Sequence, residues 1–105
     1  MIDIFKKLFS SQPEVSYSEL VDRGAIIIDV RSKDEYAGGH IKGSINISVD
    51  QLQNNLQKLK DKSKPIITCC ASGMRSASAK TFLKSKGYSE VHNGGGWSNL
   101  QNKLR

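Results

Sequence analysis

Two adjacent cysteines, Cys69 and Cys70, are the residues of this 105-residue sequence with the clearest chemical potential. They end an apolar segment that begins at Pro65, and small residues follow them. This pattern predicts a buried strand that turns tightly into a helix. Backbone N–H groups of such a turn can converge on one point, where they stabilise a thiolate and hold an anion beside it. The pattern therefore indicates a nucleophilic cysteine at the carboxyl end of a strand, and Cys70 is the candidate.

The residues after Cys70 are the candidate binding loop. Gly73 permits close backbone approach or a positive φ, and Arg75 adds a fixed positive charge with planar donors. We expect Cys70 to be the catalytic nucleophile and the next six residues to bind substrate: Ala71, Ser72, Gly73, Met74, Arg75 and Ser76. Within this loop the side chains of Ser72 and Met74 would shape access to the sulfur. The plainer alternative is an inert thiol, since cysteine is often buried.

Cys69 gives the same segment a second interpretation. Counted from Cys69, Arg75 completes a Cys-x5-Arg spacing, which is that of the loops of tyrosine phosphatases and arsenate reductases. Those phosphatase loops usually have glycine three residues after the cysteine, where this chain has Ser72. Counted from Cys70, that position is Gly73, and we prefer this register. Cys69 is then a small buried strand residue that faces away from Cys70, with a resolving thiol as the alternative.

Composition limits the partners and the compartment. The net charge is +6, but the lysines are spread along the chain rather than interleaved with aromatic residues, so we expect no nucleic acid and a small anionic substrate. Adjacent cysteines fit disulfide geometry badly, which favours free thiols and a cytoplasmic protein. His40 and His92 are the only histidines and no metal-ligand spacing is present, so we expect no metal and no cofactor.

Alternating strand and helix signals position the candidate loop. Ser16 with Glu19, and Ser32 with Glu35, have capping-box spacing. Strands joined through helices predict an α/β domain with a mainly parallel sheet and helices on both faces, and chemistry at the carboxyl ends of the strands. The predicted strands are 14–15, 25–30, 44–47, 65–69 and 90–93. The predicted helices begin at residues 16, 32, 48, 76 and 97, and the helix that begins at 48 carries a leucine stripe over 52–59. Residues 94–96 are predicted to form a tight loop.

The first 13 residues form a separate segment. Apolar residues near helical spacing, with lysines between them, predict an amphipathic segment over 2–9, followed by a connector over 10–13. Packing on its own domain is the commoner outcome for such a segment, and contact with a partner or membrane surface is the alternative. The domain itself is expected over residues 14–105. No apolar run approaches the length of a transmembrane segment, and no secretory signal is visible.

Several segments, in order, resemble the rhodanese family. Residues 29–31 are similar to its DVR element, and residues 35–47 (EYAGGHIKGSINI) to its E-[FY]-x-x-G-H-I-x-G-A-x-N-I stretch, with Ser44 in place of alanine. Residues 70–76 (CASGMRS) resemble its C-x-x-G-x-R-S loop, and residues 94–97 (GGGW) its closing GG-x-x-W element, with the tryptophan one position early. The resemblance covers about residues 14–104.

The resemblance implies a rhodanese-like α/β fold with a parallel five-stranded sheet and Cys70 as nucleophile. In the family's chemistry, the thiolate takes the outer sulfur of an anionic donor such as thiosulfate and becomes a persulfide. A thiol or a cyanide-type acceptor then removes that sulfur, and a protein persulfide is a further possible partner. No metal or organic cofactor is implied. The alternatives are a non-catalytic binding or regulatory module of the same fold, and a phosphatase or arsenate reductase that uses Cys69.

Other polar residues receive structural roles. We expect Asp29 to satisfy loop N–H groups or a nearby cation, and Arg31 to pair with an acidic side chain. His40 is interpreted as a scaffold residue that fixes a loop by hydrogen bonds, and Trp97 as a core residue. His92 is assigned no role.

Overall fold

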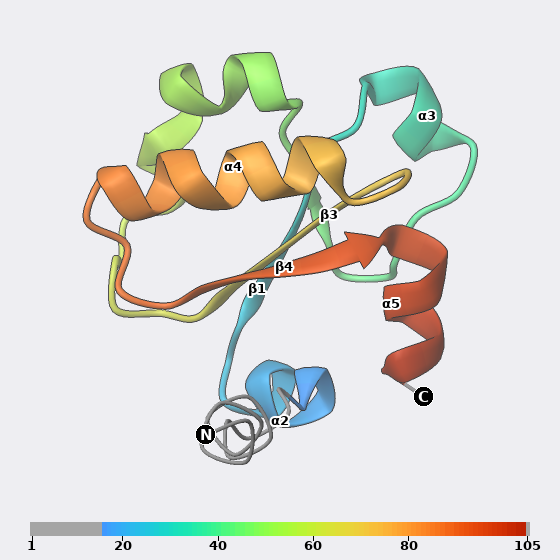
Figure 1. Cartoon of the computed structure of the whole chain (residues 1–105), viewed down its shortest axis with the longest axis horizontal. Helices are drawn as coiled ribbons and strands as arrows, with labels where there is room; N and C mark the ends of the chain where they lie inside the picture. The colour runs from blue at the N-terminus through green and yellow to red at the C-terminus, as the bar shows by residue number, and fades with distance from the viewer. Residues whose placement is uncertain (1–15, 105) are drawn as a thin grey trace, which may run out of the picture.

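A parallel β-sheet forms the centre of the structure, a computed structural model that describes residues 16–104 (Figure 1). Its strands are β1 (Ile26–Asp29), β2 (Ile45–Asn46), β3 (Ile66–Cys70) and β4 (Val91–Gly96). They lie in the order β2-β1-β3-β4, and every neighbouring pair is parallel. The predicted α/β class with a parallel sheet is therefore confirmed.

The sheet has four strands within the described residues, where the family resemblance implied five. The short strand predicted at Glu14 and Val15 lies outside the described residues, as do the amphipathic segment and connector predicted within residues 1–13. The strand predicted over 44–47 is shorter, because only Ile45 and Asn46 pair with β1.

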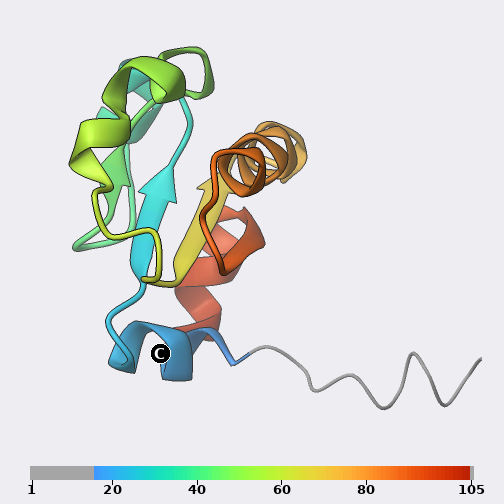
Figure 2. The ribbon, with the colours of Figure 1, turned by 90° about the vertical axis from the view of Figure 1, so that its left-hand side faces the viewer.

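Helices cover both faces of the sheet, as predicted (Figures 1 and 2). One face carries α4 and the 3-10 helix η1, the other carries α2 and α5, and α3 lies near the carboxyl ends of the strands. This arrangement leaves the loops after the strands as the place where side chains from different elements can meet. The helices are α2 (Tyr17–Asp22), α3 (Lys33–Ala37), η1 (Val49–Lys58), α4 (Met74–Ser85) and α5 (Trp97–Lys103).

Strand β3 is buried along its whole length, as its continuous apolar sequence predicts. Successive side chains point to opposite faces, so Ile66 and Cys70 pack with the core on the side of η1 and α4. Ile67 and Cys69 pack with the core on the side of α2 and α5. The two adjacent cysteines are therefore separated by the sheet.

The leucine-bearing segment forms a 3-10 helix rather than the regular helix that its spacing predicts. The backbone leaves helical geometry at Asn55, whose φ is −124° and ψ 19°, and the Asn55 side chain donates to the Gln51 carbonyl at 2.7 Å. Asparagine competes with the helical backbone in this way. Leu52 and Leu59 are nevertheless buried in the core, as the stripe predicts.

The three glycines predicted to form a tight loop instead continue β4. Asn93 lies opposite Thr68 and Gly96 opposite Cys70, so the register shifts between these pairs. Gly95 has φ +80°, and a Cβ at Gly94 would lie 2.9 Å from atoms of the neighbouring core. Only glycine fits these positions, and a bulge of this kind bends and twists the strand. Composition alone suggested a loop, because glycine leaves no side-chain alternation to read.

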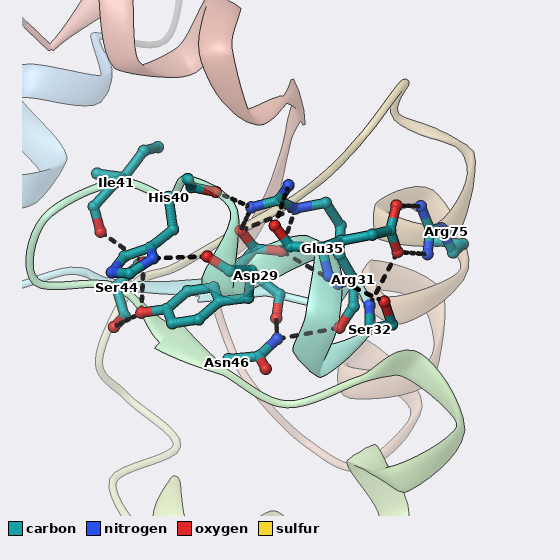
Figure 3. A network of polar contacts seen from close by, with 11 residues as sticks. Asp29, Arg31, Ser32, Glu35, His40, Ile41, Ser44, Asn46 and Arg75 are labelled. Atoms are coloured by element: carbon teal, nitrogen blue, oxygen red, sulfur yellow. Dashed lines mark hydrogen bonds and ion pairs between the residues drawn. The ribbon is translucent and has the colours of Figure 1, made fainter.

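A buried ion pair joins the end of β1 to the loop before β2 (Figure 3). Asp29 is 0% and Arg31 4% exposed, and Arg31 Nη2 lies 2.7 Å from Asp29 Oδ2. The guanidinium also donates to the carbonyls of Gly39, at 2.7 Å, and Glu35, at 3.3 Å, and it lies 4.8 Å from the ring centre of Trp97. The predicted pairing of Arg31 with an acid is confirmed.

The same loop is held by the scaffold residue His40. Its Nδ1 lies 2.8 Å from the Tyr36 carbonyl, and its ring stacks on the Tyr36 ring at 3.7 Å between centres. Tyr36 in turn donates to the Ser44 carbonyl at 2.7 Å. These contacts tie α3 to the start of β2, as the scaffold interpretation of His40 predicts.

Removing the buried carboxylate should destabilise the fold strongly. We expect Asp29→Ala to lower the free energy of unfolding by about 3–5 kcal/mol, because it leaves a buried guanidinium unpaired. The matched control is Arg23→Ala, which breaks the exposed Arg23–Glu90 pair and should cost at most about 1 kcal/mol. Urea unfolding followed by circular dichroism measures both, and equal losses would contradict the structural role of Asp29.

Candidate active site

Strand β3 ends at Cys70, and the chain then turns into α4. Gly73 stands immediately before α4 with φ +104°, a conformation that other residues adopt only with strain. This turn brings the Gly73 N–H to 2.9 Å from Cys70 Sγ. The glycine that the sequence singled out is therefore required by the backbone geometry at the sulfur.

Three polar groups meet at the Cys70 sulfur. Besides the Gly73 N–H, the Ser76 N–H donates to Sγ at 3.4 Å, and the Ser76 hydroxyl oxygen lies 3.3 Å from it. Ser76 is fully buried and belongs to the first turn of α4. The loop thus converges on the sulfur, as predicted from small residues between a strand and a helix.

The two thiols differ in acidity. Burial acts to raise the pKa of Cys70, but hydrogen bonds from Ser76 and from the N–H groups of Gly73 and Ser72 outweigh it and lower the pKa. Burial, followed by the negative charge of Asp29, raises the pKa of Cys69 to about 12. Cys70 is therefore the more acidic of the two thiols and the one that forms a thiolate more readily.

Cys69 has the structural role that the sequence analysis preferred. It is 0% exposed and packs with Ile67 and Leu100 on the face opposite Cys70. A thiol in this position has neither the ionisation nor the access that a resolving thiol or a phosphatase nucleophile needs. The geometry favours the register that begins at Cys70.

Arg75 lies beside the loop but already has a partner. Its guanidinium makes two hydrogen bonds with the Glu35 carboxylate of α3, at 2.7 and 2.9 Å (Figure 3). Glu35 also accepts from the Ser32 N–H, which completes the predicted capping box. Arg75, and then the Ser32 N–H, hold the pKa of Glu35 at about 2. Any anion at the loop would share Arg75 with Glu35, so an anion-binding role for Arg75 stays a prediction.

The remaining loop residues form an exposed rim. Ala71 and Ser72 are exposed, and Met74 is 79% exposed, which is high for a large apolar side chain. A role for Ser72 and Met74 in shaping access to the sulfur stays a prediction.

Asn93 of β4 contacts the loop and was missed in the sequence. Its Oδ1 accepts from the Ser76 hydroxyl at 2.6 Å and from the Gly95 N–H at 2.9 Å. Its Nδ2 donates to the Gly73 carbonyl at 3.1 Å. The sequence feature that could have identified Asn93 is its position directly before the glycine run, on a strand predicted to lie in the same sheet as the strand that leads to Cys70.

Two negative findings apply to the part of the chain that the structure describes. Between residues 16 and 104, no three His, Cys, Asp or Glu side chains lie close enough to hold a metal ion. Within the same residues, no helix has both the length and the apolar character needed to cross a membrane.

The fold and the loop together define a parallel α/β domain that presents one acidic thiol at the carboxyl end of a central strand. Comparison with known families identifies this class. The family model described as Rhodanese-like domain matches residues 14–103. The chain belongs to the rhodanese-like domain family.

Relatives with sulfurtransferase names are among the matches. Thiosulfate sulfurtransferase GlpE of Pseudomonas fluorescens (strain SBW25) is 31% identical over 84 residues, covering 80% of this chain and 76% of that protein. The structure of the human single-domain sulfurtransferase TSTD1 has a TM-score of 0.71 and 30% identity, covering 87% of this chain and 96% of that chain. YqhL of Bacillus subtilis (strain 168) is 34% identical over 84 residues, or 79% of this chain, which spans 66% of its length. The chain therefore has a family-level likeness to rhodanese-type transferases.

The difference between the two thiols predicts selective alkylation. Iodoacetamide should modify Cys70 and leave Cys69 unmodified in the folded protein at neutral pH. The rate should rise with pH as the thiolate forms, with its midpoint below that of an unperturbed cysteine, because hydrogen bonds lower the pKa of Cys70. Peptide mapping by mass spectrometry locates the label, and Cys70→Ala is the control that should lose it. Labelling of Cys69 in the folded protein would contradict the assignment.

Proposed function

We propose that this protein is a sulfurtransferase that carries sulfane sulfur as a persulfide on Cys70. The observation that carries the proposal is the set of hydrogen bonds that the Gly73 N–H and the Ser76 N–H donate to Cys70 Sγ. Relatives named thiosulfate sulfurtransferase, at 31–35% identity, support the same chemistry.

The proposed reaction has two half-reactions, as covalent catalysis requires. In the first, the Cys70 thiolate attacks the outer sulfur of thiosulfate and forms a new S–S bond. The sulfur–sulfur bond of the donor breaks, and sulfite leaves with the electron pair. In the second, cyanide or a thiolate attacks the terminal sulfur of the persulfide, which returns Cys70 to the thiolate. No oxidant or reductant is needed, because sulfane sulfur passes between nucleophiles.

The loop has the same task in both half-reactions. The thiolate and the persulfide anion each place negative charge at the end of β3, where N–H groups are already oriented. Donors that are fixed in advance stabilise such charge without reorganising. Hydrogen bonds lower the pKa of Cys70, which increases the fraction of thiolate available for the first attack.

Thiosulfate represents the class of donor rather than a single substrate. A small-molecule or protein persulfide offers the same outer sulfur, and a thiol or a cyanide-type nucleophile can accept it. An organised set of donors around an acidic thiol supports transfer over a purely binding role. The buried, weakly acidic thiol of Cys69 supports transfer over phosphatase chemistry in the longer register.

The covalent half-reaction can be tested by intact-mass spectrometry after incubation with thiosulfate. We expect the unaltered protein and Cys69→Ser to gain one sulfur atom, about 32 Da, and Cys70→Ala to gain none. Reduction with a thiol should remove the added mass.

The outcome separates the proposal from its alternatives. A gain in mass that persists in Cys70→Ala would refute Cys70 as the carrier. No gain with thiosulfate or with an alkyl persulfide would refute sulfur transfer by this loop and favour the binding module.

Glu35 should affect the use of an anionic donor. Glu35→Gln keeps an oxygen that can accept from the Ser32 N–H but removes the charge that neutralises Arg75. We expect the KM for thiosulfate to fall roughly three- to tenfold, since Arg75 becomes free to attract the dianion. Steady-state kinetics with cyanide as acceptor measures the change.

A matched control comes from the opposite end of the sheet. Glu90 directly precedes β4 and pairs with Arg23 and His92, so Glu90→Gln removes the same charge away from the loop. It should leave the KM for thiosulfate unchanged. An unchanged or raised KM in Glu35→Gln would mean that Arg75 does not contribute to donor binding.

A further inference from the structure

A short row of polar contacts runs from the Cys70 sulfur into β4. Cys70 Sγ lies 3.3 Å from Ser76 Oγ, which lies 2.6 Å from Asn93 Oδ1. Cys70 and Ser76 are buried, and Asn93 is partly buried. The row connects the candidate nucleophile to a residue outside the loop.

The contacts of Asn93 fix which way its side-chain amide points. The Gly95 N–H donates to one end of the amide at 2.9 Å, which must therefore be the oxygen. The other end lies 3.1 Å from the Gly73 carbonyl, which requires the amide nitrogen. A flipped amide would place two donors together at one end and two acceptors together at the other.

With this orientation, the single proton of the Ser76 hydroxyl is already committed. Asn93 Oδ1 can only accept, so the 2.6 Å contact uses the hydroxyl proton. Ser76 Oγ then presents a lone pair toward Cys70 Sγ. That lone pair accepts a hydrogen bond from a neutral thiol, but it opposes a negatively charged sulfur. The Ser76 N–H donates to the sulfur in either case, but the Ser76 hydroxyl stabilises a thiolate only if it turns away from Asn93.

We propose that Asn93 is a positioning residue that acts on Cys70 through Ser76. While Cys70 is a neutral thiol, the Ser76 hydroxyl donates its hydrogen bond to the Asn93 amide oxygen. When Cys70 becomes a thiolate or a persulfide anion, the hydroxyl turns and donates to the sulfur instead. The N–H groups of Gly73 and Ser76 stabilise the anionic sulfur, and Asn93 has the opposite effect because it competes for the Ser76 hydroxyl. A less stabilised thiolate is a stronger nucleophile toward sulfur, so this opposition favours transfer over storage.

Other ionisable groups around Cys70 remain the same in the variants that test this proposal. Among the charged groups of α4, α3 and β1, Arg75 pairs with Glu35 and Arg31 pairs with Asp29, whereas Lys33 and Asp34 of α3 are exposed. Asp50 and Lys58 of η1 are exposed, His92 of β4 pairs with Glu90, and Cys69 stays neutral. A change in the acidity of Cys70 on altering Asn93 therefore reports on the hydroxyl or on the loop itself.

A double-mutant cycle separates these two causes. The pH dependence of Cys70 alkylation by iodoacetamide is measured in a Cys69→Ser background for Asn93→Ala, Ser76→Ala and the pair. We expect Asn93→Ala to lower the midpoint by roughly 0.5–1 pH unit, because the freed hydroxyl then donates to the thiolate. Ser76→Ala should raise the midpoint, and Asn93→Ala should cause no further fall when Ser76 is absent.

The opposite results would overturn the proposal. If Asn93 serves only to hold the Gly73 carbonyl, its loss loosens the loop and the midpoint rises. If the fall in Asn93→Ala persists in the Ser76→Ala background, Asn93 does not act through the hydroxyl. An unchanged midpoint would also exclude the proposed role.

A second measurement needs no change at Asn93. The S–H stretching band of Cys70 in the Cys69→Ser protein should show a hydrogen-bonded thiol below the alkylation midpoint, and Ser76→Ala should shift the band toward that of a free thiol. An unshifted band would contradict donation from the thiol to Ser76. The persulfide part of the inference rests on the proposed function. Neither measurement uses a sulfur donor, so a failure of the role proposed for Asn93 can be distinguished from a failure of sulfur transfer.

Discussion

Negative charge on a buried sulfur is unfavourable unless hydrogen-bond donors face it, and this constraint determines the form of the whole site. Cys70 is 1% exposed, so burial alone would keep its thiol protonated. Hydrogen bonds from the Ser76 side chain and from the N–H groups of Ser76 and Gly73 outweigh burial and lower the pKa of Cys70, and these two N–H groups lie 3.4 and 2.9 Å from Sγ. The tight turn, its left-handed glycine and the start of α4 at Met74 are all needed to direct these groups at one atom.

The turn is held in place by its neighbour in the sheet. Because the register of β4 shifts after Asn93, Gly96 lies opposite Cys70, and a Cβ at Gly73 would lie 3.4 Å from Gly95. The glycines let the two segments approach closely, and the Asn93 side chain bonds to the loop across that short gap. The irregular end of β4 is therefore part of the site. The close approach of the two segments explains why β4 gives up regular pairing with β3 at this point.

A second layer of contacts connects the loop to the segment between β1 and β2. Arg31, neutralised by Asp29, donates to the Glu35 carbonyl within α3 and to the Gly39 carbonyl in the turn after it (Figure 3). This fixes the helix that carries Glu35, whose carboxylate meets Arg75 across 40 positions of sequence. The buried pair thus has an indirect effect on charge at the loop: it determines where Glu35 lies, and Glu35 determines whether Arg75 is available to an anion.

Local sequence patterns were enough to predict the α/β class, the buried strand that leads to Cys70, the glycine of the loop and the pairing of Arg31 with an acid, because these follow from local periodicity, turn chemistry and the cost of burying a lone charge. Strand alternation also predicted that Cys69 faces away. The pairing of Arg75 with Glu35, the extension of β4 by the glycines and the contact of Asn93 with Ser76 became visible only in the folded structure. Those contacts join residues distant along the chain, and their distances depend on how strands and helices pack, which no local pattern encodes.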